Sequence, residues 1–179
     1  MHQTTQKTHP YLIKKGFPDL EMSVWDTEEG EGRLVIPMRN DGRIVGCQLI
    51  DQEGDKKFLF GQQTKGASFV LDNKGTPMFC EGLATGLSIQ SVMRANKMRY
   101  TIYVCFSAGN MKEIAKKIPT GIVIADNDSS GTGERIAKEI GKPYWISDQI
   151  GEDFNDFHQR VGLFPASQAL KKCLVQSVG

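Results

Sequence analysis

Several residue patterns are missing from this sequence, and each absence narrows the classes of protein to which it can belong. The four cysteines, Cys47, Cys80, Cys105 and Cys173, are far apart and none forms a Cys-x-x-Cys pair. The chain therefore offers no ligand set for a zinc ribbon, and we expect buried free thiols in a reducing cytosol. No apolar run reaches membrane-spanning length, and no secretory signal is present. We therefore expect a cytoplasmic protein with no membrane partner.

The sequence also lacks an excess of charge of either sign. Its 22 lysines and arginines offset 21 acidic residues and leave a formal net charge of +1. Any binding of nucleic acid must therefore come from local basic patches. The glycine-rich stretch at residues 129–133 lacks both the third glycine of a dinucleotide-binding loop and the lysine of a P-loop. We interpret it as a turn into a helix whose N-terminus could help to hold a phosphate.

What is present is the composition of an ordinary folded α/β protein. Hydrophobic residues make up 39% of the 179 residues, charged residues make up 24%, and there are 19 glycines. A chain of this length can bury one good core, or one medium-sized domain with a small domain attached. We therefore expect a compact fragment with a single chemical task.

The first part of the sequence predicts an antiparallel β subdomain. Residues 1–32 combine a short amphipathic piece with an acidic patch, and we interpret them as a lead-in. Runs rich in β-branched residues follow, and the turn sequence NDG at residues 40–42 favours a tight hairpin, because glycine tolerates the positive φ of such turns. We therefore expect a small basal subdomain over residues 33–74, with its antiparallel sheet at residues 33–71.

From residue 75 the pattern changes to strands that alternate with helices. Such alternation predicts an α/β domain with a mostly parallel central sheet flanked by helices on both faces. We assign this domain to residues 75–162 and expect a C-terminal tail or helix over residues 163–179. The expected strands are at residues 77–82, 101–106, 121–126 and 143–147, and the expected helices are at residues 83–97, 110–118 and 133–141.

Acidic residues follow three of the predicted strands, and they are Glu81, Asp126, Asp128, Asp153 and Asp156. Residues beyond the carboxyl ends of parallel strands meet at one edge of the sheet, where ligands bind. Carboxylates gathered there repel one another unless a cation neutralises them, and an all-oxygen ligand set favours Mg²⁺ or Mn²⁺. Two such ions can support nucleotidyl transfer. The alternative role for any one of these acids is a helix cap.

The acidic motifs also carry a family resemblance. EG at residues 81–82, DND at 126–128 and GEDFND at 151–156 resemble the Toprim domain that primases, topoisomerases and some nucleases share. Further segments, among them HPYLIKKG, CEGLATGLSI and FSAGNM, are similar to primases of plasmids, phages and integrated mobile elements. The resemblance extends over about residues 9–162.

This resemblance implies a fold, an activity and a set of site residues. The fold is the Toprim fold with a small basal β subdomain, as in the catalytic core of bacterial replicative primases. The activity is a DNA-directed RNA polymerase that uses Mg²⁺ or Mn²⁺ to synthesise short RNA primers on single-stranded DNA. The implied catalytic residues and metal ligands are Glu81, Asp126 and Asp128, with Asp153 and Asp156 as further metal ligands.

Basic residues of the expected basal subdomain form a second candidate site. The resemblance places Lys57 and Lys65 where primases hold the phosphates of template or nucleotide, and Arg39 lies in the same hairpins. Asn110, at the end of the turn at residues 107–110, could help to hold a phosphate at a helix N-terminus. Simpler interpretations stay open, because lysines also protect a solvated strand edge and Ser or Asn is a common helix cap.

Some features depart from the pattern of related primases. Thr85 stands where replicative primases have a second acid, and Ser107 stands where element primases often have one. The metal site would therefore depend more on Asp153 and Asp156. The sequence also has neither a zinc-binding domain nor a Walker A helicase motif. We therefore expect a helicase and a zinc-binding template-recognition domain as partners, fused or separate, besides single-stranded DNA and ribonucleoside triphosphates.

Two other functions stay open on the sequence. The same acidic fold serves nucleases and topoisomerase-like strand cleavage, although the four tyrosines offer no obvious nucleophile for the latter. A non-catalytic DNA-binding Toprim module is the third hypothesis, and the intact Glu81, Asp126 and Asp128 count against it. The expected hairpins favour a primase.

Overall fold

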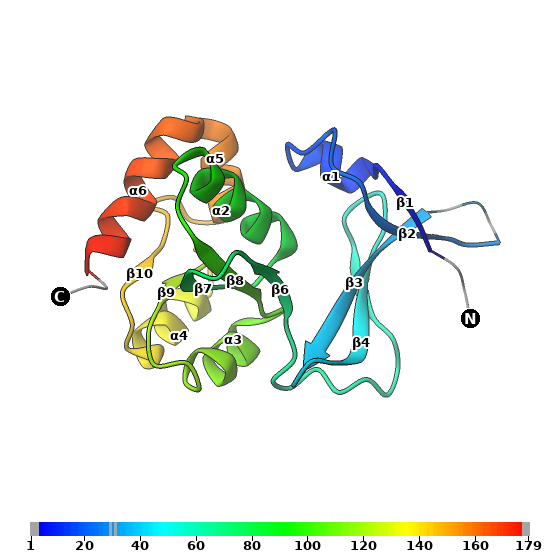
Figure 1. Cartoon of the computed structure of the whole chain (residues 1–179), viewed down its shortest axis with the longest axis horizontal. Helices are drawn as coiled ribbons and strands as arrows, with labels where there is room; N and C mark the ends of the chain where they lie inside the picture. Colours follow the sequence, from blue (N-terminus) through cyan, green and yellow to red (C-terminus); the bar gives the residue numbers. More distant parts are fainter. Residues whose placement is uncertain (1–3, 29, 31, 177–179) are drawn as a thin grey trace. The chain divides into compact units, whose positions relative to one another are not determined.

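In the computed structural model, which describes residues 4–28, 30 and 32–176, the chain divides between Phe69 and Val70 into two units (Figure 1). The first unit contains a five-stranded sheet in the order β1-β2-β3-β4-β5, with antiparallel pairing throughout. The antiparallel β subdomain that the sequence predicts is therefore confirmed. Its elements are β1 (Thr4–Lys7), α1 (Pro10–Lys14), β2 (Met22–Asp26), β3 (Gly32–Asn40), β4 (Arg43–Ile50) and β5 (Lys56–Phe58).

The hairpin of β3 and β4 forms where the NDG sequence predicts it. Asp41 and Gly42 have φ values of 48° and 77°, which a two-residue turn between twisted strands requires. The register of the two strands shifts between Met38 and Arg39. There the main chain of Arg39 exchanges two hydrogen bonds of 2.9 Å with Ser68. The returning chain is thus fixed beside β3 at the end of the first unit.

One face of this sheet carries the core of the first unit. Leu34, Ile36 and Met38 are alternate residues of β3 and have no exposed surface, and the same holds for Leu12 of α1 and Ile50 of β4. Because successive side chains of a strand point to opposite faces, the intervening residues of β3 lie on the other face. That second face is only partly buried.

The segment interpreted as a lead-in, residues 1–32, adds structure to the sheet in its described part. β1 pairs with β2, and β2 pairs with β3, so two strands extend the hairpin. His9 begins α1, where its Nδ1 accepts a hydrogen bond from the Tyr11 amide and its Nε2 lies 3.1 Å from the Gly32 carbonyl oxygen. β1 reads TTQK and is largely exposed, so it lacks the apolar alternation by which strands are recognised in a sequence.

The second sheet has five strands in the order β10-β9-β7-β8-β6. β7 pairs in parallel with both β8 and β9, and β9 pairs in parallel with β10. The mostly parallel sheet that the sequence predicts is therefore confirmed. Its strands are β6 (Phe69–Asp72), β7 (Thr76–Cys80), β8 (Tyr100–Val104), β9 (Ile122–Ile124) and β10 (Tyr144–Trp145).

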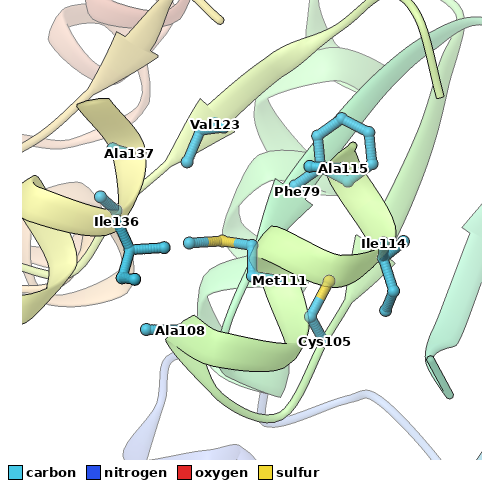
Figure 2. Close-up of a cluster of buried hydrophobic side chains, with 10 residues drawn as sticks. Phe79, Cys105, Ala108, Met111, Ile114, Ala115, Val123, Ile136 and Ala137 are labelled. Carbon is cyan, nitrogen blue, oxygen red and sulfur yellow. The ribbon is translucent and has the colours of Figure 1, made fainter. Parts of the chain in front are cut away.

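Helices cover both faces of this sheet, as the alternating pattern predicts. On one side α3 and α4 pack on the strands through a buried cluster that includes Phe79, Met111, Val123 and Ile136 (Figure 2). On the other side α2, α5 and α6 contact one another (Figure 1). No helix in the described part of the chain is long and apolar enough to span a bilayer. The helices are α2 (Leu83–Ala95), α3 (Ala108–Ala115), α4 (Thr132–Ile140), α5 (Phe154–Val161) and α6 (Leu163–Gln176).

Two features differ from the expected organisation. The predicted first sheet extends to residue 71, but β6 pairs in the second sheet, at its edge beside β8. The reason lies in the turn after β6, where the Asn73 amide donates to the Tyr100 carbonyl oxygen at 2.7 Å and ties this segment to β8. The C-terminal segment, expected as a tail or a helix, is the helix α6 in its described part.

Candidate active site at the carboxyl ends of the parallel strands

Glu81 is fixed by the ends of two neighbouring parallel strands. It follows β7 directly, and its carbonyl oxygen accepts a hydrogen bond of 2.9 Å from the Phe106 amide. One residue earlier, the Cys105 amide donates to the Cys80 carbonyl oxygen at 2.8 Å. Phe106 has a φ of 70°, a conformation that costs free energy for a residue with a side chain and that is concentrated at functional sites. The backbone at Glu81 is therefore held in a defined and partly strained turn.

Three of the predicted acids lie near enough to one buried thiol to raise its pKa. Cys80 is fully buried, and its pKa is raised well above the usual thiol value, first by burial and then by nearby negative groups. Besides the Cys105 thiol, these groups are the carboxylates of Asp126, Glu81 and Asp153. Because each carboxylate follows a different strand, the predicted convergence at the carboxyl edge of the sheet is visible in the electrostatics of Cys80.

Asp126 is held by a close approach between a strand end and a helix. It lies two residues beyond β9, and the backbone of Gly133 in α4 packs directly on its carbonyl oxygen. A Cβ atom at Gly133 would lie far inside van der Waals contact with that oxygen. Glycine at this position therefore lets α4 begin against the backbone of Asp126.

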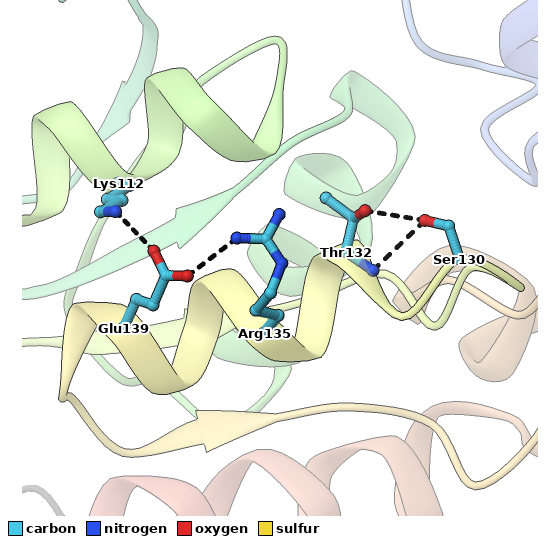
Figure 3. Close-up of polar contacts among 5 residues, drawn as sticks. All are labelled: Lys112, Ser130, Thr132, Arg135 and Glu139. Atoms are coloured by element: carbon cyan, nitrogen blue, oxygen red, sulfur yellow. Dashed lines mark hydrogen bonds and ion pairs between the residues drawn. The ribbon is translucent and has the colours of Figure 1, made fainter.

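Asp128 is a capping residue of α4. Its Oδ1 accepts hydrogen bonds from the Ser130 amide at 2.8 Å and from the Thr132 amide at 3.4 Å, and its Oδ2 accepts one from the Gly133 amide at 3.2 Å. The Ser130 hydroxyl also donates to Oδ1, and these bonds lower the pKa of Asp128 below its usual value. The Ser130 hydroxyl contacts that of Thr132 at 2.7 Å (Figure 3). The N-terminus of α4, interpreted from the sequence as a phosphate site, is thus occupied by this carboxylate.

Asp153 has a capping role as well. It is the N-cap of α5, and its Oδ1 accepts a hydrogen bond of 2.8 Å from the amide of Asp156. Asp156 lies in the first turn of the same helix, where a negative charge favours the helix dipole. Among the residues that the structure describes, no three His, Cys, Asp or Glu side chains are grouped closely enough to hold one metal ion.

A polar network, which the sequence did not reveal, connects the two acidic loops. The amide of Asn127, between the two aspartates of DND, donates to the Glu152 carbonyl oxygen at 3.3 Å, and its carbonyl oxygen accepts from the Gly151 amide at 2.5 Å. Its side chain donates to the Ser147 carbonyl oxygen at 2.9 Å. These hydrogen bonds therefore fix the loop that carries Asp126 against the loop that leads to Asp153.

Glu152 anchors the second loop to α5. Its carboxylate is 8% exposed and accepts two hydrogen bonds from the Arg160 guanidinium, at 2.6 Å from Nε and 2.9 Å from Nη2. The hydroxyl of Ser147 donates to it as well. The pKa of Glu152 is lowered, first by the bonds from Arg160. This ion pair of a buried carboxylate with an exposed guanidinium was not expected, because nothing in sequence spacing distinguishes Glu152 from the acids around it.

His158 has a structural position. Its Nδ1 lies 3.1 Å from the hydroxyl of Ser88 in α2, and the same hydroxyl accepts a hydrogen bond of 2.9 Å from Asn155. Ser88 and Asn155 are fully buried. Burial lowers the pKa of His158. The network therefore joins α2 to α5 behind the acidic edge.

The predicted basic residues lie in the first unit, apart from the acids in sequence and in fold. Lys57 in β5, Lys65 in the following loop and Arg39 in β3 are all exposed. The Arg39 guanidinium donates to the Gly42 carbonyl oxygen at 3.3 Å. Asn110 lies in the second unit, where its side chain donates to the Cys105 carbonyl oxygen at 2.7 Å while Ser107 caps α3.

Comparison with known proteins gives this arrangement a family. Residues 77–163 match the family model described as the Toprim domain, so this part of the chain is a Toprim domain, as its sequence motifs indicate. The match spans β7 to the end of α5 and includes every predicted acidic residue.

Two solved structures have the same fold over most of the chain. One is an assembly of the bacteriophage T7 lagging-strand DNA polymerase with the primase domains of two gp4 subunits bound to an RNA/DNA hybrid and dTTP. Its matched chain is 14% identical, with a TM-score of 0.63 over 97% of this chain and 93% of that one. The other is the primase fragment of the bacteriophage T7 primase-helicase protein, which is 16% identical, with a TM-score of 0.60 over 85% of this chain and 66% of that one. At these identities the likeness concerns the fold.

Proposed function

We propose that this chain is the catalytic core of a DNA primase, which synthesises short RNA primers on single-stranded DNA by metal-dependent nucleotidyl transfer. The observation that carries the proposal is the convergence of Glu81, Asp126 and Asp153 around Cys80, at the edge of a Toprim sheet. The fold shared with the bacteriophage T7 structures supports it, because their names describe primase domains bound to an RNA/DNA hybrid and dTTP, and a primase-helicase.

A divalent cation, Mg²⁺ or Mn²⁺, is the cofactor that the chemistry of these donor atoms favours. Glu81 and Asp126 are the first candidate ligands, and Asp128, Asp153 and Asp156 are the further ones. All offer hard carboxylate oxygens, which these ions prefer. When bound, the ion supplies the positive charge that activates an attacking 3′-hydroxyl and stabilises the leaving pyrophosphate.

The capping bonds define what the protein residues do at such a site. Asp128 and Asp153 accept amide hydrogen bonds, and these bonds orient their carboxylates. Each carboxylate oxygen keeps a second lone pair for a cation. Asn127 holds the loops of Asp126 and Asp153 together through its bonds to Gly151 and Glu152. We infer that the protein contributes carboxylate oxygen ligands in fixed positions, and that the cation relieves their mutual repulsion.

Nucleic acid and nucleotide contacts are assigned to the basic residues and to Asn110. Arg39, Lys57 and Lys65 are exposed, and their cations suit the phosphates of a template or a nucleotide. Asn110 lies beside the N-terminus of α3, a position that suits a phosphate oxygen. The other proposed partners are ribonucleoside triphosphates, a helicase and a zinc-binding template-recognition domain, fused or separate.

The test of this proposal is an assay with labelled single-stranded DNA, Mg²⁺ and the protein, run with and without ribonucleotides. We expect short RNA products only when nucleotides are present, and only slow synthesis by the chain alone. Glu81→Gln keeps the shape of the side chain but removes its charge, and should lower the rate at least about a hundredfold. Metal-dependent degradation of the DNA without nucleotides would instead identify a nuclease. DNA binding without either reaction, even after a helicase and a zinc-binding domain are added, would identify a non-catalytic module.

A further inference from the structure

The second face of the antiparallel sheet in the first unit is unusually apolar. A groove of about 340 Å³ lies on it, lined by Thr4, Trp25, Val35, Cys47, Leu49 and Leu59. An antiparallel sheet with its core on one face normally presents polar side chains on the other. Exposed apolar patches of this kind mark binding sites.

Strand register places two cations on the face of the groove. Lys57 is the antiparallel partner of Leu49, and Arg33 is the partner of Trp25. Directly opposed residues of antiparallel strands share a face, so both cations lie beside groove residues. Arg33 lies 4.0 Å from Asp51, an acid that a bound phosphate would have to displace. Lys57 is exposed at the edge strand.

The loop after β5 extends the apolar surface. Leu59 lines the groove and is 51% exposed, and Phe60 next to it is fully exposed. Trp25 and Phe60 offer aromatic faces, while Lys57 offers a charge within the same segment as Phe60. This combination of an apolar, aromatic floor and cationic rim suits a single strand, whose bases stack on aromatic rings while its phosphates meet lysine and arginine.

We propose that this groove binds the unstacked bases of single-stranded DNA, with Trp25 as a stacking residue and Lys57 as a phosphate contact. The inference deepens the proposed function, because it assigns a binding surface to the template strand. A duplex has no free base faces to offer to the groove. The proposal therefore requires single strands with intact bases. It also predicts different effects for Lys56 and Lys57 of β5, because these two lysines lie on opposite faces of the sheet.

The experiment uses the full chain and a 16-nucleotide oligothymidylate, followed by quenching of tryptophan fluorescence. The signal of Trp25→Phe, which retains Trp145, is subtracted to isolate Trp25. We expect quenching by the oligothymidylate, and little by a duplex or by an abasic strand of equal length. Trp25→Ala should weaken binding of the labelled strand about tenfold, as loss of one stacked base predicts, and Trp25→Phe should restore most of it.

The lysines of β5 give a matched pair of controls. Lys57→Ala should weaken binding and lower its salt dependence by about one phosphate contact. Lys56→Ala removes an equally exposed charge whose partner Ile50 lies on the core face, and should change binding little. Should Trp25→Ala fail to fold by circular dichroism, Leu59→Ser at the groove rim replaces it and should weaken binding as well.

Two results would overturn the assignment: equal affinity for the abasic strand, or unchanged affinity in Trp25→Ala and Leu59→Ser. Either would leave the groove to a different partner, such as an apolar peptide segment. Glu81→Gln should retain the Trp25 quenching in full, since it lies in the other unit. A failure of RNA synthesis and a failure of the groove to bind are therefore observed separately.

Discussion

The two sheets of this protein use their faces differently. In the first unit one face of the sheet carries the core, and the other is partly exposed, so its candidate binding residues lie on a face and along an edge strand. In the second unit both faces are covered, and the central strands are buried throughout β9 and over the last three residues of β7. Their candidate site residues lie beyond the strand ends. Strand register therefore determines the first candidate site, and the turns after the strands determine the second.

Glycine positions sharpen this comparison. A Cβ atom at Gly133 would strike the backbone oxygen of Asp126, which cannot move without displacing β9 or α4. A Cβ atom at Gly46 in the first unit would strike the end of the Gln62 side chain, which can rotate away. We expect Gly133→Ala to cost about 3 kcal/mol or more, the largest effect considered. Gly46→Ala should cost about 1 kcal/mol, mainly the hydrogen bond of 2.7 Å from the Cys47 amide to Gln62.

Urea unfolding of the two glycine variants, followed by circular dichroism, measures both costs. Gly109→Ala is the control, because a Cβ atom there meets nothing within 4 Å and alanine favours the helix. Equal destabilisation by Gly133→Ala and Gly46→Ala would contradict the distinction between a rigid strand end and an adaptable sheet face.

The ion pair of buried Glu152 with exposed Arg160 gives the next largest effect. Glu152→Gln should lower the free energy of unfolding by about 2 kcal/mol at pH 7, because a charged pair of hydrogen bonds is lost. The pKa of Glu152 is lowered from its ordinary value of 4.5, so its stabilisation is present above that pH. It should disappear as the pH falls below about 4.5 towards the lower pKa of the folded state.

Thermal melting from pH 7 to pH 3 tests this, with Glu134→Gln as the control. Glu134 pairs with Lys138 at 2.9 Å on the surface of α4, where an exposed (i, i+4) pair contributes little to stability. The difference between wild type and Glu152→Gln should shrink as the pH falls. A difference that stays constant over the whole range would show that the Glu152 charge does not contribute.

Of the substitutions at Gly133, Glu152 and Asp128, the one at Asp128 should change the stability least. Whether it raises or lowers the stability is informative. The sequence alone suggests that removing a carboxylate from the acidic cluster relieves repulsion and raises the melting temperature without metal. The structure reverses this expectation, because Asp128 caps two amides of α4, those of Thr132 and Gly133, and also accepts from the Ser130 amide before the helix. Asp128→Ala should cost about 1 kcal/mol in metal-free buffer. A rise in melting temperature would show that repulsion outweighs the cap.

Much of the fold could be predicted from the sequence. The NDG turn specifies the β3–β4 hairpin through its two positive φ values, and the alternation after residue 75 specifies the parallel sheet. β1 could not be predicted, because it is polar and gains its strand conformation from pairing with β2. β6 could not be assigned to its sheet, because tertiary contacts with β8 fix its place there, among them the hydrogen bonds of Asn73 with Tyr100 and of Asp72 with Thr101.

The place of the predicted acids in the fold could be predicted from the sequence, but their contacts could not. Strand ends indicated where the acids gather, since the carboxyl ends of parallel strands share an edge. The sequence could not distinguish Asp126 from Asp128, although one packs beneath Gly133 and the other caps α4. Nor could the sequence reveal the pairing of Glu152 with Arg160, because this pairing depends on how α5, which carries Arg160, packs against the loop of Glu152.

The most direct test of the central claim, that the acids at the carboxyl edge hold the catalytic cation, is calorimetric titration of the metal-free protein with Mn²⁺. We expect binding in the millimolar range or tighter, as for carboxylate sites whose ions retain several waters. Asp126→Asn keeps the shape of the side chain and should weaken this binding at least about tenfold, since it removes a charged ligand. Asp148→Asn, at an exposed position outside the predicted ligand set, should leave it unchanged. Undiminished Mn²⁺ binding in Asp126→Asn would contradict the account.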